Sequence, residues 1–278
     1  MKSFLLKFFK KTLSCSLILI VILILAKYYY DQYWQRQNIN FLIETKQDSR
    51  IFPHKVNSVA KLQDLWQDGL RAFEVDLRFG DYEQDVFIVG HDLGDSNISF
   101  EQMLLQVEPA QIKKIWLDVK NLNKSNYQKV LKRLRYLDNL FNIKKKAIIE
   151  TPKAEAFITE FTKAGWHMSY YMPNSLIANL WSKQDEDAMQ ELANKILQQV
   201  KAFEFSAISF TSPEYAYVNK YLSKSLPEDL VFHIWSLPPL RRPSFQADIV
   251  DNQLYLDRRI KTLLTSYFCS FSCQLFYE

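Results

Sequence analysis

Four residues between positions 54 and 91 could together support acid–base and metal chemistry. Glu74 and Asp76 are two apart in the apolar run AFEVDLRF, so both carboxylates point to one face of a predicted strand. Two like charges on one buried face resist ionisation unless a cation neutralises them. Mg²⁺ and Ca²⁺ prefer such oxygen ligands. His54 and His91 flank the pair in sequence, and histidine exchanges protons near neutral pH. The stretch therefore predicts a Mg²⁺ or Ca²⁺ site with two proton carriers.

A second pair of charged residues extends this set. Asp118 and Lys120 are two apart in IWLDVKN and again share one strand face, which makes Asp118 a third candidate metal ligand. Lys55 and Lys120 are the nearby cations that could contact an anionic group. Ion pairing of Glu74 and Asp76 with Arg71, Arg78 or Lys120, without any metal, is the alternative. Further candidates are Asn57, Asp92, Glu150 and Trp235.

Alternating segments must position these residues. Strands are predicted at 51–56, 72–79, 86–91, 114–120, 147–151, 167–172, 207–210, 230–236 and 261–266. Helices are predicted at 59–68, 99–107, 126–141, 154–164, 186–203, 213–223 and 245–252. Strand and helix in repeated alternation indicate a parallel sheet with helical crossovers. About eight strands in this length favour an α/β fold of the (β/α)8 TIM-barrel type over residues 51–278, with the candidate residues at the catalytic ends of the strands.

The first thirty residues predict a membrane anchor. Lysines precede the apolar run Leu13–Ala26, and Tyr28, Tyr29 and Tyr30 follow it. Basic residues before the run favour a cytoplasmic N-terminus, and tyrosines suit the membrane interface. We expect an uncleaved single-pass helix (1–30), a juxtamembrane helix or linker (31–50) that could include a short strand, and a barrel outside the cytoplasm, in a periplasm or lumen. A cleaved signal peptide and a buried soluble helix are the alternatives.

The charge of the chain agrees with this division. Residues 1–30 hold five of the 35 basic residues and none of the 31 acidic ones, so residues 31–278 carry a net charge of −1. The basic excess is therefore a topology signal, and no nucleic-acid partner is expected. Cys269 and Cys273 could pair in an oxidising compartment or remain thiols. His167 and His233 are expected to be structural, because one starts a strand and the other lies in mid-strand.

The order of these motifs resembles that of the glycerophosphodiester phosphodiesterases. Their first strand ends in His-Arg-Gly and is followed by Asn, a helix, a Glu-x-Asp strand and a strand ending in His-Asp. A later strand carries Leu-Glu-x-Lys. The corresponding residues here are His54, Lys55, Asn57, Glu74, Asp76, His91, Asp92 and Leu117–Lys120. Ile234–Ser236 and Leu263–Tyr267 look like the family's last two strands. The opening His-Lys-Val-Asn-Ser is also similar to the menorin-type branch of the phospholipase-C-like phosphodiesterases.

The resemblance implies a metal-dependent enzyme that hydrolyses a phosphodiester, such as a glycerophosphodiester or a phospholipid headgroup. It implies that His54 and His91 are the general acid and base and that Glu74, Asp76 and Asp118 hold the metal. Lys120 would contact the phosphoryl oxygens. Glu150 has no counterpart in the family; its strand-end position makes it a candidate ligand or substrate contact.

Four positions depart from the family pattern. Where the family has Arg, Gly, Glu and Asp, this chain has Lys55, Val56, Asp118 and Ser266, respectively. Lysine keeps the charge of arginine but loses its two-pronged contact with phosphate. These departures motivate the alternative that the protein is a barrel without turnover, which binds a phospho-ligand, a glycan or a protein at the membrane.

Overall fold

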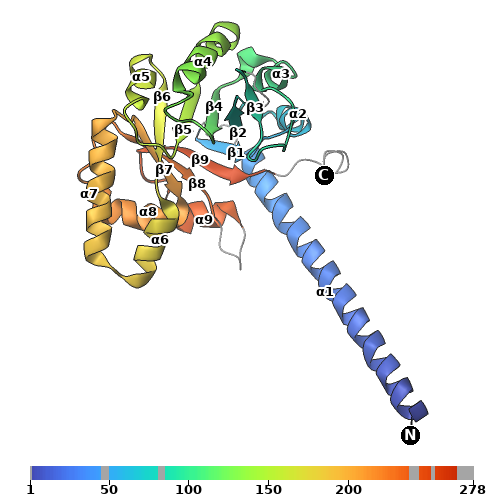
Figure 1. Cartoon of the computed structure of the whole chain (residues 1–278). Helices are drawn as coiled ribbons and strands as arrows, with labels where there is room; N and C mark the ends of the chain where they lie inside the picture. The colour runs from blue at the N-terminus through green and yellow to red at the C-terminus, as the bar shows by residue number, and fades with distance from the viewer. Residues whose placement is uncertain (1, 45–49, 81–84, 238–243, 252–253, 268–278) are drawn as a thin grey trace.

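The computed structural model shows an α/β fold built on one curled, mostly parallel sheet (Figure 1). The structure describes residues 2–44, 50–80, 85–237, 244–251 and 254–267. Within these ranges the sheet has nine strands in the order β1-β9-β8-β7-β6-β5-β4-β2-β3, and every neighbouring pair is parallel except β2 with β3. The predicted parallel α/β architecture is confirmed.

The strand bounds all lie within about two residues of those predicted. They are β1 Ile51–His54, β2 Ala72–Phe79, β3 Phe87–Val89, β4 Lys114–Val119, β5 Ala147–Thr151, β6 His167–Tyr171, β7 Ala207–Thr211, β8 Val231–Trp235 and β9 Ile260–Ser266. The α-helices are α1 Lys2–Glu44, α2 Val59–Gln67, α3 Phe100–Leu104, α4 Tyr127–Phe141, α5 Ile158–Lys163, α6 Asn174–Lys183, α7 Glu186–Ala202, α8 Tyr215–Tyr217 and α9 Phe245–Asp251. Short 3₁₀ turns lie at Pro109–Gln111 and Ser212–Glu214, and a π-helical turn at Val218–Leu222.

The two faces of the sheet contribute to two hydrophobic clusters. The larger one packs the outward-facing strand residues against the helices. The smaller one lies on the inner face and consists of Phe52, Trp116, Ile148, Trp235 and Leu264. Because side chains alternate along a strand, residues two positions away from this small cluster share the inner face. These include the candidate site residues His54, Asp118 and Glu150.

The sheet curls so that its edge strand β1 meets β2, the strand next to the other edge. No strand ladder joins them among the described residues, but the Val56 amide, just after β1, donates to the Glu74 carbonyl oxygen at 2.9 Å. The curled sheet thereby brings His54 at the end of β1 close to the carboxylates of β2.

Three local predictions were wrong. The third strand, expected to be parallel, is antiparallel to β2, because the seven residues between Phe79 and Phe87 are too few for a helical crossover. Helix α6 was missed, since Pro173 ends the preceding strand pattern but acts here as the residue before the first helical turn. The helix expected at 213–223 is divided into a 3₁₀, an α and a π turn.

Helix α1 runs without a break through the expected boundary at residue 30 (Figure 1). Its apolar residues Leu17–Leu25 are exposed, and the helix is long and apolar enough to cross a membrane by length and composition. Its end is different: Asn38, Phe41 and Leu42 are buried against the rest of the fold. Cys269 and Cys273 lie outside the described residues.

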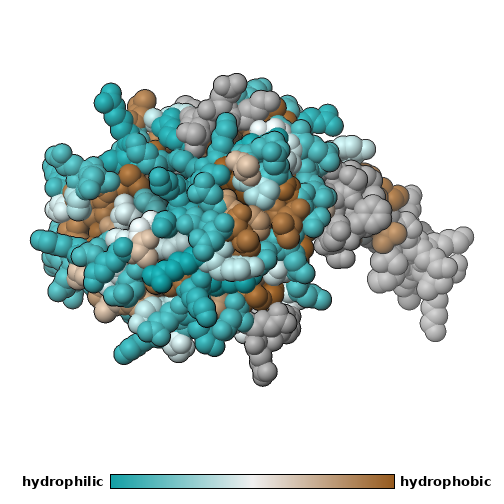
Figure 2. Space-filling view, turned by 90° about the horizontal axis from the view of Figure 1, so that it is seen from above, coloured by the Kyte–Doolittle hydropathy of each residue, from teal (hydrophilic) through white to brown (hydrophobic). Residues whose placement is uncertain are grey.

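Away from α1, the surface seen in Figure 2 is mainly hydrophilic, with hydrophobic residues in separate patches. A mixed surface of this kind is ordinary for a folded domain.

Candidate active site

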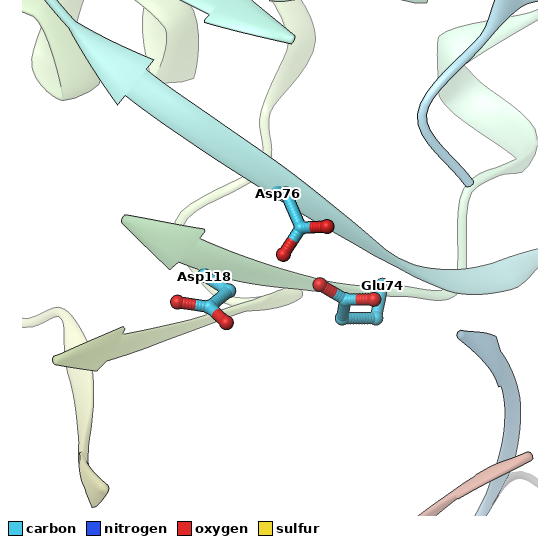
Figure 3. Close-up of side chains that lie close together, drawn as sticks. All are labelled: Glu74, Asp76 and Asp118. Carbon is cyan, nitrogen blue, oxygen red and sulfur yellow. The ribbon is translucent and has the colours of Figure 1, made fainter. Parts of the chain in front are cut away.

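Three carboxylates converge on the inner face of the sheet (Figure 3). The strand register pairs Asp76 of β2 with Asp118 of β4, and Asp118 with Glu150 of β5. Glu74 lies one inward position earlier on β2. One oxygen each of Glu74, Asp76 and Asp118 lies within 4.8 Å of the others, and all three residues are buried. The structure therefore brings together the three predicted metal ligands.

Burial and mutual repulsion disfavour full ionisation of this group. Burial, then the charges of Asp76 and Asp118, raise the pKa of Glu74 well above its usual range. Burial likewise raises the pKa of Asp118, and burial with the charge of Asp118 raises that of Glu150. Burial alone would also raise the pKa of Asp76, but Lys120, with the Asn57 hydrogen bond and His54, outweighs it and the net shift is downward.

Lys120 supplies the positive charge closest to the carboxylates. Its Nζ lies 2.7 Å from Asp76 Oδ1 and 2.5 Å from Asp118 Oδ2. Although burial alone would lower it, the charges of Asp118 and Asp76 raise the pKa of Lys120. Lys120 is thus an ammonium that balances two of the three carboxylates.

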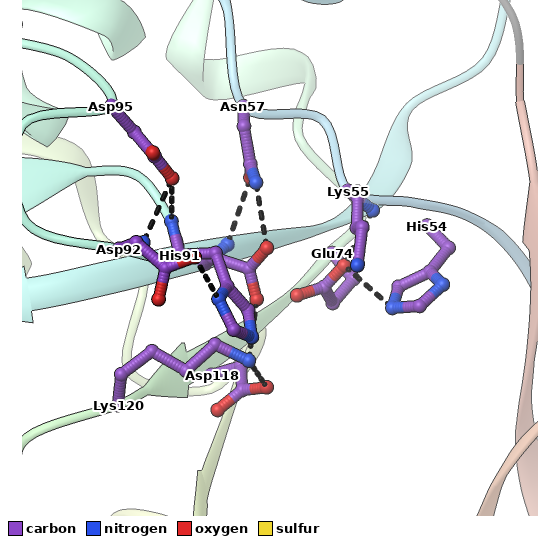
Figure 4. A network of polar contacts seen from close by, with 10 residues as sticks. His54, Lys55, Asn57, Glu74, His91, Asp92, Asp95, Asp118 and Lys120 are labelled. Carbon is purple, nitrogen blue, oxygen red and sulfur yellow. Dashed lines mark hydrogen bonds and ion pairs between the residues drawn. The ribbon is translucent and has the colours of Figure 1, made fainter.

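The first residues after β1 fasten the carboxylates of β2 in place (Figure 4). The Lys55 amide donates to Glu74 Oε2 at 2.6 Å. Asn57 Nδ2 donates to Asp76 Oδ2 at 2.6 Å, and the Asp76 amide donates to Asn57 Oδ1 at 3.0 Å. Lys55 has a φ of 54°, a left-handed conformation that costs a residue with a side chain about 1–2 kcal/mol. The predicted position of Asn57 beside the site is therefore matched by two direct contacts.

His54, at the end of β1, lies beside the Glu74 carboxylate. Its Nε2 is 3.5 Å from Glu74 Oε2, and its side chain is 24% exposed. Burial, opposed in part by Asp76, lowers the pKa of His54 to about 3. The imidazole is consequently neutral at pH 7.

His91 reaches the site from a turn after β3 and not from the end of a parallel strand. The Gly90 amide donates to the Asp76 carbonyl oxygen at 2.9 Å, which sets the turn above β2. A side chain at Gly90 (φ +147°) would lie 2.9 Å from Asp95 Cβ. Asp95 Oδ2 accepts from the amides of His91 and Asp92 at 2.9 and 2.8 Å. His91 Nδ1 lies 3.1 Å from Asp92 Oδ2, and its ring is half exposed.

A pocket of about 400 Å³ opens where these groups meet. Its lining joins residues from most of the parallel strands or the loops that follow them: His54, Lys55, His91, Asp118, Lys120, Glu150, Pro152, Tyr171, Thr211, Trp235 and Leu237. Seven candidates from the sequence therefore share one pocket, and Glu74, Asp76 and Asn57 lie directly behind it.

Some contributors were not found from the sequence. Lys61 Nζ donates to the carbonyl oxygens of His54 and Lys55 at 3.1 and 2.7 Å, and burial lowers its pKa to about 8. Nothing in the sequence marks this lysine, which sits on an ordinary amphipathic helix. Asp95 had a usable signal, because an acidic residue in the turn GHDLGD is typical of a side chain that caps backbone amides.

His167 and His233 lie outside the pocket lining, as expected of structural residues. Their Nε2 atoms are 2.9 Å apart, and His167 Nδ1 lies 3.1 Å from Ser206 Oγ. His233 also packs against the ring of Trp116, with the ring centres 5.3 Å apart.

The donor set fits a hard divalent cation. Three carboxylates with one oxygen each inside 4.8 Å are the ligands that Mg²⁺ or Ca²⁺ takes. Glu74 Oε1 is buried and has no hydrogen-bond partner among the described residues, so one ligand atom is uncommitted. Asp76 and Asp118 would have to exchange Lys120 for the ion.

Comparison with solved structures finds the same fold in glycerophosphodiester phosphodiesterases. The enzyme from Parabacteroides distasonis has a TM-score of 0.53 at 10% identity, over 81% of this chain and 95% of its own. Proteins assigned this activity from Agrobacterium tumefaciens and Galdieria sulphuraria give TM-scores of 0.51 and 0.50 at 12% identity, each over 78% of this chain and 93% of theirs. No protein-family model and no curated protein sequence matches the chain.

The comparison confirms at the level of the fold the resemblance indicated by the motifs. At 10–12% identity it says nothing about which substrate is used here. The chemistry must therefore be argued from the pocket itself.

Proposed function

We propose that the protein is a metal-dependent phosphodiesterase on a closed (β/α)8 barrel of the TIM type. The observation that carries the proposal is that Glu74, Asp76 and Asp118 form one carboxylate group beside His54, His91 and Lys120. These are the groups that hydrolysis of a phosphodiester needs: a metal site, a cation and two proton carriers. The glycerophosphodiester phosphodiesterase fold supports the same reaction.

Each of the pocket residues has its own role in the proposed reaction. His54 takes a proton from water, whose oxygen attacks the phosphorus. His91, at the exposed mouth, gives a proton to the leaving alkoxide, so the products are a phosphomonoester and an alcohol. Lys120 and Lys55 hold the phosphoryl oxygens, Trp235 borders the substrate, and Glu150 is a further substrate contact. A Mg²⁺ or Ca²⁺ held by Glu74, Asp76 and Asp118 would offset the charge that develops on the phosphoryl oxygens.

Hydrolysis of bis-p-nitrophenyl phosphate by the full chain in mild detergent tests the proposal. We expect activity that needs Mg²⁺, Ca²⁺ or Mn²⁺ and falls 10²- to 10⁴-fold in His54→Gln and His91→Gln. His167→Gln is the matched control, because it changes a histidine outside the pocket. Equal rates for wild type and both pocket variants with every metal would refute the enzyme proposal.

A second candidate is a barrel that binds a phospho-ligand, a glycan or a protein without turnover. The pairing of Lys120 with Asp76 and Asp118 favours it, since two carboxylates are already balanced without a metal. Calorimetry with glycerophosphocholine in the presence of Mg²⁺ or Ca²⁺ separates the two: tight binding with the diester recovered intact supports the binding protein.

We further propose that α1 anchors the chain by residues 1–30, that residues 31–50 connect it to the barrel 51–278, and that the barrel lies outside the cytoplasm. The exposed apolar residues of α1 and the preceding lysines support this topology. A C-terminal alkaline phosphatase fusion should be active in a bacterial host. A well-expressed but inactive fusion would overturn the orientation.

A further inference from the structure

The end of α1 fixes the direction in which its apolar part leaves the barrel. Asn38 Oδ1 accepts from the amide of Phe245, the first residue of α9, at 3.1 Å. Twelve residues later, Arg50 Nη1 donates to the carbonyl oxygen of Tyr255, just beyond the end of α9, at 3.3 Å. Asn38 of α1 therefore lies beside the start of α9, and Arg50 lies beside the segment that follows α9.

Helix α9 begins at the catalytic end of the sheet. Asp248, in its first turn, accepts from Ser236 Oγ at 2.5 Å and from Ser212 Oγ at 3.2 Å. These serines directly follow β8 and β7. Asn38 is consequently level with the ends of the strands, and residues 2–37 of α1 extend beyond the face that carries the pocket. Figure 1 shows this part of α1 as a long rod clear of the barrel.

The spacing along α1 brings that face close to a membrane. Tyr28, Tyr29 and Tyr30 are exposed and follow the apolar run. From Tyr30 to Asn38 the helix rises about 12 Å, at about 1.5 Å per residue. The polar layer on each side of a bilayer is about 5–8 Å thick. A span ending at the tyrosines therefore places the pocket face within reach of the headgroups.

Three exposed leucines on the pocket face suit a position next to the membrane. Leu93 is 67% exposed in the turn that carries His91, and Leu237 is 52% exposed after β8 and lines the pocket. Leu176, 45% exposed, is in the first turn of α6 after β6. All three follow strands whose ends border the pocket.

We propose that α1 holds the pocket mouth against the membrane in which it is inserted, and that the substrate is the phosphodiester headgroup of a lipid in that membrane. The acyl chains stay in the bilayer while the headgroup enters between the leucines. Water adds to phosphorus, one P–O ester bond breaks, and the released alcohol or diacylglycerol takes the proton given by His91. This inference rests on the proposed phosphodiesterase function.

An activity test uses the full chain in vesicles of equal parts phosphatidylethanolamine and phosphatidylglycerol. Phosphatidic acid and diacylglycerol are both measured, together with hydrolysis of soluble bis-p-nitrophenyl phosphate. We expect Leu93→Glu and Leu176→Glu to lower lipid hydrolysis at least tenfold and to leave soluble hydrolysis unchanged. Leu256→Glu is the matched control, since Leu256 is 75% exposed beyond the far end of α9.

The outcomes separate the two proposals. Hydrolysis of the soluble diester alone, or equal lipid hydrolysis by wild type and both leucine variants, would overturn the lipid proposal and leave the phosphodiesterase standing. No hydrolysis of any diester would instead remove the phosphodiesterase function.

The orientation has a readout that does not depend on activity. Leu93→Cys and Leu256→Cys, each in a chain with its natural cysteines replaced by serine, are labelled with a fluorophore in vesicles that contain headgroup-quencher lipid. We expect at least threefold stronger quenching at position 93 than at position 256. Equal quenching at both positions would refute the membrane-facing pocket.

Discussion

Lys120 decides the charge balance of the pocket. Its ammonium contacts both Asp76 and Asp118, and no other lysine or arginine side chain in the described part of the chain forms an ion pair with either of them. Removing one partner of a buried ion pair costs about 3–5 kcal/mol, because the remaining charge is left uncompensated. An exposed pair contributes below about 1 kcal/mol.

We therefore predict that Lys120→Met lowers the free energy of unfolding of the metal-free protein by about 3 kcal/mol and abolishes hydrolysis. Added Mg²⁺ or Ca²⁺ should raise the melting temperature more in Lys120→Met than in wild type, since the ion no longer competes with the ammonium. Thermal unfolding with chelator and with metal measures both effects.

Lys129→Met is the control for that experiment. Lys129 pairs with Asp85 at 3.0 Å, with both side chains more than 60% exposed, so its loss should change stability by less than about 1 kcal/mol and leave the metal response unchanged. A similar metal response in wild type and Lys120→Met would show that the carboxylates do not form the metal site.

Residue spacing predicted part of this arrangement. Asp118 and Lys120 are two residues apart and therefore share one strand face, which can be predicted from the sequence alone. The choice of partner does not follow from the sequence. Lys120 was expected on the phosphoryl oxygens or, as the alternative, in an ion pair with Glu74 and Asp76. The structure has it on Asp76 and Asp118, and this choice depends on the register between β2 and β4.

At the scale of elements, the contact between β1 and β2 differs from the other strand contacts. Its hydrogen bonds come from the Val56 and Lys55 amides and from the Asn57 side chain, and they end on Glu74 and Asp76. The sheet thus closes through the same carboxylates that would hold the metal.

We predict that Asn57→Ala lowers the free energy of unfolding by about 2 kcal/mol, because two hydrogen bonds, one to a carboxylate, are lost. It should also weaken metal binding, since Asp76 loses the amide that orients it. Denaturant unfolding and a metal titration followed by calorimetry measure the two effects.

Asn121→Ala offers a matched comparison. Asn121 also makes two hydrogen bonds, both at 2.8 Å and both with the backbone of Phe79, away from the carboxylates. Asn121→Ala should lower the free energy of unfolding by a similar amount without changing the affinity for the metal. Equal losses of metal affinity in the two variants would contradict a specific role for Asn57.

The success of the element predictions follows the strength of the local pattern. Strands β2 and β5 were bounded correctly because both are rich in apolar residues and are followed by Gly80 and Pro152. The predicted direction of β3 was wrong, although the short connection between β2 and β3 can be read from the sequence. The closure at β1 and β2 could not be predicted, because contacts between segments about twenty residues apart are not encoded in local periodicity.

At the scale of the molecule, stability should depend on pH through a histidine pair outside the pocket lining. Burial lowers the pKa of His167 to about 4 and that of His233 well below 6.5. The unfolded chain therefore binds more protons than the folded one below about pH 6.5. The stabilisation is fully present above pH 6.5 and is lost as the pH falls towards 4.

We predict a loss of about 2 kcal/mol at pH 5 relative to pH 7.5 from His167 alone. Urea unfolding of the full chain at both pH values measures it. The double variant His167→Gln with His233→Gln should show a smaller loss, since every other titrating group is unchanged. The same pH dependence in both proteins would show that the pair does not titrate on unfolding.

The closure of the sheet through Glu74 and Asp76 has an evolutionary consequence. A descendant that lost catalysis would still need both carboxylates and Asn57 to keep its first two strands together. Their retention in such a pseudoenzyme would reflect folding and not turnover. Within the described part of the chain the His91 side chain makes no contact between β1 and β2, so its loss would be the earlier mark of lost activity.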